Sequence, residues 1–213
     1  MSGPSPLQQT TMNTVIILVF VAMLIPITSS AEEADPALLT LERIFADEEF
    51  ETRRFGPARW LEDGSGYTTL EDSAAGEDAK DIVRYDPADG SRAVLVSASA
   101  LVPSPDAEPL TIDDYLWSED GSRLLVFTNT TKVWRRNTRG DYWLLHLDSG
   151  DLQKLGGDAE ESTMMFAKLS PDGSKVAWVD FTNKDLYVQD LESLAVTRLT
   201  NDEPEHIING TSD

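Results

Sequence analysis

The sequence repeats one short pattern three times, and this repeat constrains the fold more than any other feature. The three copies read WLEDGS at residues 60–65, WSEDGS at 117–122 and LSPDGS at 169–174. Their Asp-Gly steps are 57 and 52 residues apart. An Asp-Gly step favours a tight turn, because glycine adopts positive φ without steric cost and aspartate accepts hydrogen bonds from nearby backbone. A period near 50 residues is typical of β-propeller blades.

Residues that favour β-strands surround each of these turns. A short run follows each Asp-Gly step, at residues 67–70, 124–128 and 176–179. A second group, with a turn inside it, follows in each unit, at residues 81–96, 142–155 and 185–199. Each unit therefore reads as one four-stranded antiparallel blade. We predict an all-β fold, a partial β-propeller of about three blades, because the triple repeat favours a propeller over a β-sandwich with regular turns.

The remaining segments predict loops, a short helix and open sheet edges. Residues 71–80 and the proline-containing residues 100–109 are expected to be loops. Residues 35–51 are expected to include a short helix with Leu38, Leu41, Ile44 and Phe45 on one face. Three blades are too few to close a ring, since propellers have four to eight. The unpaired edges make association expected, and a homodimer is one form of it.

The first 31 residues predict export. Residues 15–27 form a 13-residue apolar run, which is shorter than the roughly 20 residues that span a bilayer. Small residues at Ser29 and Ala31 suit cleavage before Glu32. We therefore expect a signal peptide at residues 1–31 and a periplasmic or extracellular protein. The alternative is a membrane anchor through residues 15–27.

The predicted organisation has two parts after the signal peptide: a lead-in at residues 32–51, and a partial propeller at 52–213. The chain carries 17 basic and 38 acidic residues, a net charge of −21. Nucleic acid is therefore not an expected partner, because phosphate binding depends on clustered cations. The absence of cysteine excludes thiol nucleophiles and disulfides. We expect the three tryptophans of the blades to lie in blade cores: Trp60, Trp117 and Trp178.

The sequence contains no catalytic constellation. It has no complete G-x-S-x-G motif, and the Asp-Gly turns lack the further carboxylates of a calcium loop. No metal and no cofactor are expected. His146 lies in a predicted strand and is expected to be structural, whereas His206 lies in an acidic loop and is expected to be solvated. We assign no catalytic residue, and we predict that this chain alone is inactive.

One segment has a composition unlike the rest of the chain. Residues 132–143, KVWRRNTRGDYW, hold three arginines between bulky aromatic residues. A guanidinium group presents a planar fork of donors that suits carbonyl or carboxylate oxygens. Near the opening of a propeller, such a cluster can hold a peptide backbone. Ion pairs with neighbouring acidic side chains are the alternative, and composition alone favours them.

This segment resembles the corresponding part of the dipeptidyl peptidase IV-like family of the prolyl oligopeptidase clan. Lys-x-Trp-Arg at residues 132–135, with Tyr142 seven residues further, is similar to that family's motif. Residues 207–213, IINGTSD, resemble the run that precedes its paired glutamates. The resemblance covers about residues 39–213. It implies that Arg135 binds a substrate carbonyl oxygen.

The family resemblance also implies a whole enzyme that is longer than this sequence. It implies an eight-bladed propeller followed by an α/β-hydrolase domain with a Ser-Asp-His triad. Such enzymes release N-terminal dipeptides with proline or alanine in the second position. The glutamates and the triad are absent from this sequence. Two functional interpretations remain: a substrate-binding and gating propeller of such an enzyme, with a peptide substrate and a hydrolase domain as partners, or a non-enzymatic exported propeller that acts as a binding or scaffold module.

Overall fold

The structure is a computed structural model that describes residues 37–47, 49–50, 55–201 and 209–210. The chain divides into two units, residues 1–53 and residues 54–213. The expected signal peptide and the alternative anchor lie outside the described residues, as does His206. Within the described ranges, no helix is long and apolar enough to cross a membrane.

The described part of the first unit includes a short helix, α2 (Leu41–Phe45). Its N-cap is Thr40, whose Oγ1 accepts a hydrogen bond from the backbone N–H of Arg43 at 3.2 Å. The helix falls inside the segment for which the sequence predicts one. The side chains that were expected to share a face are all exposed: Leu38, Leu41, Ile44 and Phe45.

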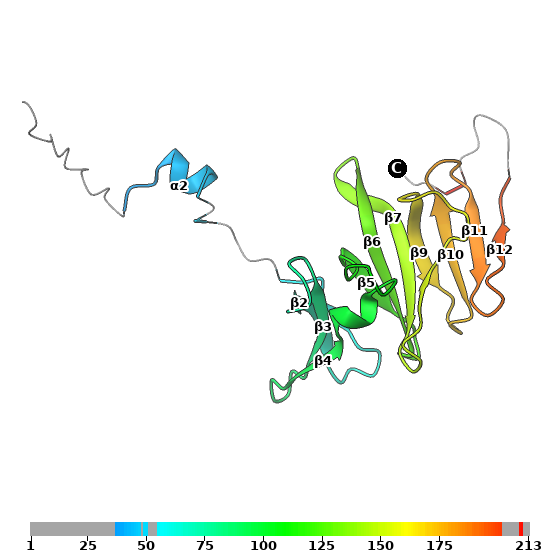
Figure 1. Ribbon diagram of the computed structural model, residues 1–213, viewed down its shortest axis with the longest axis horizontal. Coiled ribbons are helices and arrows are strands. Elements are labelled where there is room, and N and C mark those ends of the chain that lie inside the picture. The colour runs from blue at the N-terminus through cyan, green and yellow to red at the C-terminus, as the bar shows by residue number, and fades with distance from the viewer. Residues whose placement is uncertain (1–36, 48, 51–54, 202–208, 211–213) are drawn as a thin grey trace, which may run out of the picture. The chain divides into compact units, whose positions relative to one another are not determined.

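The second unit contains twelve described strands, which form a four-stranded and an eight-stranded antiparallel sheet (Figure 1). The eight-stranded sheet combines two consecutive groups of four strands, so we describe the twelve strands as three blades. The first blade consists of β1 (Arg59–Trp60), β2 (Tyr67–Asp72), β3 (Lys80–Tyr85) and β4 (Arg92–Val96). The second consists of β5 (Asp114–Trp117), β6 (Arg123–Val133), β7 (Arg136–His146) and β8 (Leu152–Lys154). The third consists of β9 (Met164–Leu169), β10 (Lys175–Asp180), β11 (Leu186–Asp190) and β12 (Val196–Arg198). The predicted all-β, partial propeller fold is confirmed.

The repeated Asp-Gly steps form the turn between the first and second strand of each blade. Gly64, Gly121 and Gly173 have φ angles of 68°, 69° and 68°, in the left-handed region that glycine adopts without strain. In all three turns the aspartate accepts a hydrogen bond from the backbone N–H two residues ahead: the distances to the Oδ1 atoms of Asp63, Asp120 and Asp172 are 2.9, 3.0 and 3.0 Å. The repeat therefore encodes the same hairpin three times.

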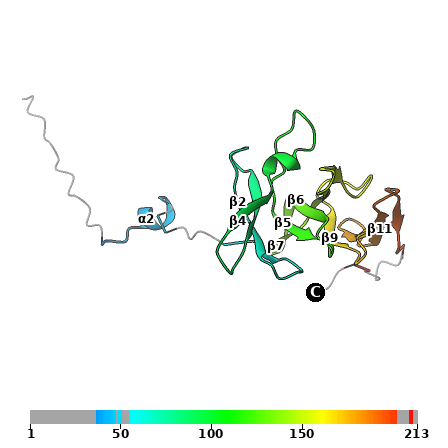
Figure 2. The ribbon, with the colours of Figure 1, turned by 90° about the horizontal axis from the view of Figure 1, so that it is seen from below.

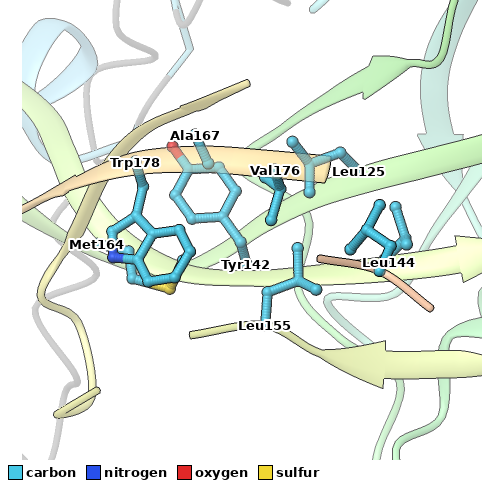
Figure 3. Close-up of a cluster of buried hydrophobic side chains, with 9 residues drawn as sticks. Leu125, Tyr142, Leu144, Leu155, Met164, Ala167, Val176 and Trp178 are labelled. Carbon is cyan, nitrogen blue, oxygen red and sulfur yellow. The ribbon is translucent and has the colours of Figure 1, made fainter. Parts of the chain in front are cut away.

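Two hydrophobic cores hold the three blades together. Side chains alternate across a strand, so the continuous apolar run in β6 supplies both cores. Leu124 and Val126 pack with the first blade, whereas Leu125 packs with the third. Figure 3 shows Leu125 and Tyr142 in the core that the second and third blades share. In Figures 1 and 2 the blades follow one another in chain order.

The three tryptophans of the blades have different environments. Trp178 is 2 % exposed and belongs to the core between the second and third blades. Trp117 is partly buried, and its indole N–H donates to Thr68 Oγ1 at 3.0 Å. Trp60 is 66 % exposed, so its assignment to a blade core was wrong. It lies in the two-residue edge strand β1, which pairs with β2 at the end of the described sheet. The indole ring of Trp60 packs against the ring of Tyr67.

Both predicted loops are shorter than expected. In the segment at residues 71–80, β2 continues to Asp72 and β3 begins at Lys80, with Glu71 paired to Asp81. The segment at residues 100–109 starts inside a 3-10 helix, η1 (Ala98–Leu101). Leu101 is fully buried in the core between the first and second blades, and this burial favours the ordered turn.

Candidate functional site

The two central strands of the second blade extend beyond the sheet as an arm, which we define as residues 128–141. Strands β6 and β7 contain 11 residues each. Strand β5 pairs with β6 only between Leu124 and Phe127. The last six residues of β6 therefore pair with β7 alone, over a length of about 20 Å at 3.3 Å per residue. Figure 1 shows this long hairpin.

The tip of the arm presents an aromatic ring and two guanidinium groups to solvent. Trp134 and Arg135 form the turn, and Trp134 has a φ of 58° and is 92 % exposed. Arg135 and Arg136 are also exposed. Among the described residues, neither arginine forms an ion pair with a carboxylate. The ion pairing that composition favours is therefore not found for Arg135 in this part of the chain.

The third arginine of the arm, Arg139, contacts an aromatic ring of the third blade. The guanidinium of Arg139 lies over the ring of Phe181, 4.4 Å from its centroid. The ammonium group of Lys184 lies 3.5 Å from the same centroid, and burial lowers the pKa of Lys184. The guanidinium of Arg139 therefore joins the arm to the third blade through a cation–π contact.

A buried carboxylate fixes the base of the arm. The side chain of Asp141 is 8 % exposed and accepts two hydrogen bonds, from Asn129 Nδ2 at 2.8 Å and from the backbone N–H of Ser162 at 2.9 Å. The ammonium group of Lys154 lies 3.5 Å from the same carboxylate. Thr131 and Ser162 share a further hydroxyl contact at 2.9 Å. These contacts tie both strands of the arm to the segment that connects the second and third blades.

A cavity of about 360 Å³ lies beside the arm. Strands β7 and β9 pair at Arg139 with Met165 and at Gly140 with Met164, and the ladder stops there. Phe166 then has a φ of 58°, which an extended strand does not accommodate. The next three residues of each strand, 136–138 and 166–168, line the cavity. The cavity therefore opens where this ladder ends.

The cavity combines unpaired cations with aromatic walls. Arg136 and Lys168 line it, and within the described ranges neither has an ion pair or a side-chain hydrogen bond. The carboxylate of Asp114 is bound by the guanidinium of Arg59 at 2.6 Å and by the backbone N–H of Tyr115 at 2.8 Å. The charge of Asp114 is therefore paired with that of Arg59, and Arg136 and Lys168 give the cavity lining a net positive charge.

Tyr142 supplies one aromatic wall of this cavity. Its ring stacks on Phe127 at a centroid distance of 4.6 Å, and burial raises the pKa of its hydroxyl to about 12. The phenol therefore remains neutral near pH 7. A site with guanidinium and ammonium groups, a neutral phenol and apolar rings can bind an anionic group attached to an apolar body.

The structure separates the residues that the sequence analysis singled out. Arg135 lies at the tip of the arm, and Arg136, the first residue of β7, lines the cavity. His146 is the last residue of β7, and its backbone pairs with the turn that follows. The sequence analysis missed Lys168, because a single lysine in a strand carries no signal without its partner across the ladder. No cluster of three or more candidate metal ligands occurs among the described residues.

Comparisons with known proteins agree with this architecture. Residues 118–213 match the family described as the dipeptidyl peptidase IV (DPP IV) N-terminal region. A putative dipeptidyl aminopeptidase of Schizosaccharomyces pombe is 35 % identical over 104 residues, which are 49 % of this chain and 13 % of the relative. A probable dipeptidyl-aminopeptidase B of Neosartorya fischeri is 31 % identical over 121 residues, or 56 % of this chain and 12 % of the relative.

A solved structure extends the match to the fold. The dipeptidyl peptidase 4 of Porphyromonas gingivalis aligns with a TM-score of 0.61 and 23 % identity, over 77 % of this chain and 22 % of that protein. At this identity the likeness shows the fold alone. The chain spans about an eighth of the length of the two curated relatives. Residues 118–213 are thus similar in sequence to the dipeptidyl peptidase IV N-terminal region.

Proposed function

We propose that this propeller region binds and orients peptide substrates for a dipeptidyl-peptidase-type serine exopeptidase, with Arg135 donating hydrogen bonds to a substrate carbonyl oxygen. One observation carries the proposal. Arg135 stands unpaired among the described residues at the tip of an arm that lies within the matched region. A guanidinium group with free donors binds carbonyl and carboxylate oxygens well.

The build of the arm supports this role. A binding residue orients its ligand only when its own position is fixed. Asp141 and Arg139 hold the arm near its base. Arg135 at the tip is therefore carried by a hairpin whose base is fixed by these contacts. Such an arm also restricts access, so we propose that it excludes folded or long chains from the site.

The chemistry of this proposed enzyme belongs to an α/β-hydrolase domain that carries the serine, histidine and aspartate of the triad. The 213-residue sequence contains no complete nucleophile motif. The proposal also includes export through residues 1–31, which rests on the apolar run at residues 15–27. In this arrangement the substrates are extracytoplasmic peptides that have a free N-terminus.

The kinetic test uses the enzyme encoded by the gene, with its coding sequence read beyond Asp213. That reading is expected to give a pair of glutamates and, later, a G-x-S-x-G motif. A hydrogen bond to a charged group is worth about 1.5–3 kcal/mol. We therefore expect Arg135→Ala to lower kcat/KM for a Gly-Pro chromogenic substrate about 10- to 150-fold, with an unchanged melting temperature.

The matched control is Arg92→Ala. Arg92 is also exposed, but it is bound by Glu71 at 2.7 Å in the first blade. This variant is expected to retain the wild-type kcat/KM. Equal kinetics in Arg135→Ala and wild type, or a stop codon after Asp213 with no hydrolase domain elsewhere, would refute the proposed function.

A further inference from the structure

We propose that the cavity beside the arm is a carboxylate-binding subsite, in which Arg136 and Lys168 bind a carboxylate of a peptide ligand while Phe166 and Tyr142 contact its apolar part. The proposal deepens the proposed function, and it rests on that function only in taking the ligand to be a peptide. The site is separate from Arg135, which does not line the cavity.

The lining of the cavity differs in charge from the rest of the chain. The chain has a net charge of −21, and eight of its described basic side chains pair with carboxylates. Arg136 and Lys168 face one cavity and are unpaired within the described ranges. Two like charges beside one cavity repel each other, and an anion between them removes that repulsion. In a strongly acidic protein, a cavity with a positive excess therefore favours an anionic ligand.

The register of β7 and β9 explains how the two cations come to line one cavity. If the ladder between β7 and β9 continued beyond Arg139 and Met165, Arg136 would lie opposite Lys168. The left-handed φ of Phe166 stops the ladder before that point. The two cations therefore come from facing positions of strands that have separated, and the cavity occupies the space where backbone pairing would otherwise continue. The geometry brings both cations to one opening.

The volume and lining of the cavity fit a small peptide ligand. A volume of about 360 Å³ lies at the lower end of the range for small-molecule sites. It suits one or two amino-acid residues rather than a single inorganic ion. Phe166 is 53 % exposed within this lining, although burial of an aromatic ring is favourable. A ligand with an apolar side chain beside its carboxylate would cover that ring.

The acidic group in the cavity lining, Asp114, is paired with a guanidinium group. Asp114 would repel a carboxylate if it were free. The guanidinium of Arg59 lies 2.6 Å from Asp114 Oδ1, and the backbone N–H of Tyr115 donates to the same oxygen. This pairing reduces the repulsion.

The test is calorimetric titration of the 213-residue protein with three blocked peptides. The probes are N-acetyl-Ala-Phe with a free carboxylate, the same peptide as its C-terminal amide, and N-acetyl-Ala-Glu amide. Acetylation removes the free amine that an exopeptidase recognises, so binding of these peptides does not depend on turnover. The Arg135→Gln variant described below tests whether their binding depends on Arg135. We expect the uncharged amide to bind at least tenfold more weakly than a carboxylate peptide.

The other two probes identify the source of the carboxylate. Preference for N-acetyl-Ala-Phe assigns the subsite to a peptide C-terminus, and preference for N-acetyl-Ala-Glu amide assigns it to an acidic side chain. Equal binding of these two peptides supports a subsite that recognises a carboxylate from either source. Equal binding of all three probes, or no binding of any, would overturn the proposal.

Two variants and a neighbouring control locate the site. Arg136→Gln and Lys168→Gln are each expected to weaken carboxylate binding about tenfold, while Arg135→Gln changes it less than twofold. Equal losses in Arg135→Gln and Arg136→Gln would overturn the assignment to the cavity. The two proposals can therefore fail separately: Arg135 governs the kinetic test, and Arg136 with Lys168 governs the titration.

Discussion

Replacing Trp178 and Trp60 by alanine tests how the blades are held together. The two residues were expected to behave alike, because the sequence places both beside an Asp-Gly turn motif. In the structure Trp178 is 2 % exposed, and its ring stacks on Tyr187 with centroids 5.6 Å apart. Trp60 is 66 % exposed on an edge strand. We therefore expect very different losses of stability.

The magnitudes follow from the buried area. A buried tryptophan removes about 150–250 Å² from water, and at about 25 cal/mol per Å² this corresponds to roughly 4–6 kcal/mol. The unfolded chain already buries part of this surface, so we expect about 3–5 kcal/mol for Trp178→Ala. Trp60 buries about a third of its surface, which scales to about 1–1.5 kcal/mol for Trp60→Ala.

The measurement is urea unfolding of the 213-residue protein, followed by far-UV circular dichroism because both variants lose a fluorophore. The transition midpoint, at a similar m-value, reports the change in the free energy of unfolding. We expect the midpoint of Trp178→Ala to fall at least twice as far as that of Trp60→Ala. Equal shifts would refute the assignment of Trp178 to a core between two blades.

Two further predictions concern the turns and the base of the arm. Hydrogen bonds from serine hydroxyls and backbone N–H groups lower the pKa values of Asp120 and Asp172 to about 2. The stability that these two carboxylates contribute is therefore complete above about pH 4 and is lost as the pH falls towards 2. The double variant Asp120→Asn with Asp172→Asn should lose less stability over that pH range, as measured by urea unfolding. A pH dependence equal to that of the wild type would contradict this prediction. A Cβ at Gly140 would lie 2.6 Å from the ring of Phe127. Gly140→Ala should therefore lower the free energy of unfolding by about 1–3 kcal/mol, while Gly76→Ala, whose nearest contact is 3.4 Å, should change it by less than about 0.5 kcal/mol; equal effects in urea unfolding would contradict this account of the arm.

The blade pattern could be predicted from the sequence because it depends on local chemistry. Asp-Gly steps specify tight turns, and the β-branched and aromatic residues of β2 and β10 favour strands without knowledge of distant contacts. Strand β6 shows where local sequence no longer predicts the structure. Its first residues are apolar and were predicted, but residues 129–133 are mostly polar, and only pairing with β7 makes them a strand.

The site was harder to predict because it depends on contacts between blades. Arg135 could be selected from the resemblance of its segment to a known motif. Lys168 could not, since its proximity to the cavity depends on where the ladder between β7 and β9 stops. The exposure of Trp60 depends on its place in a two-residue edge strand, which the repeat pattern does not encode. Local patterns thus gave the blades, and tertiary contacts decided the site.

The most direct test of peptide binding at the arm is a nuclear magnetic resonance titration of the isotopically labelled 213-residue protein with a Gly-Pro peptide. This method detects millimolar affinity, which suits a region without the paired glutamates. We predict chemical-shift changes at Trp134 and Arg135, with none in the turn between β3 and β4. No change at the arm, or changes confined to other turns, would contradict the claim that the arm binds peptides.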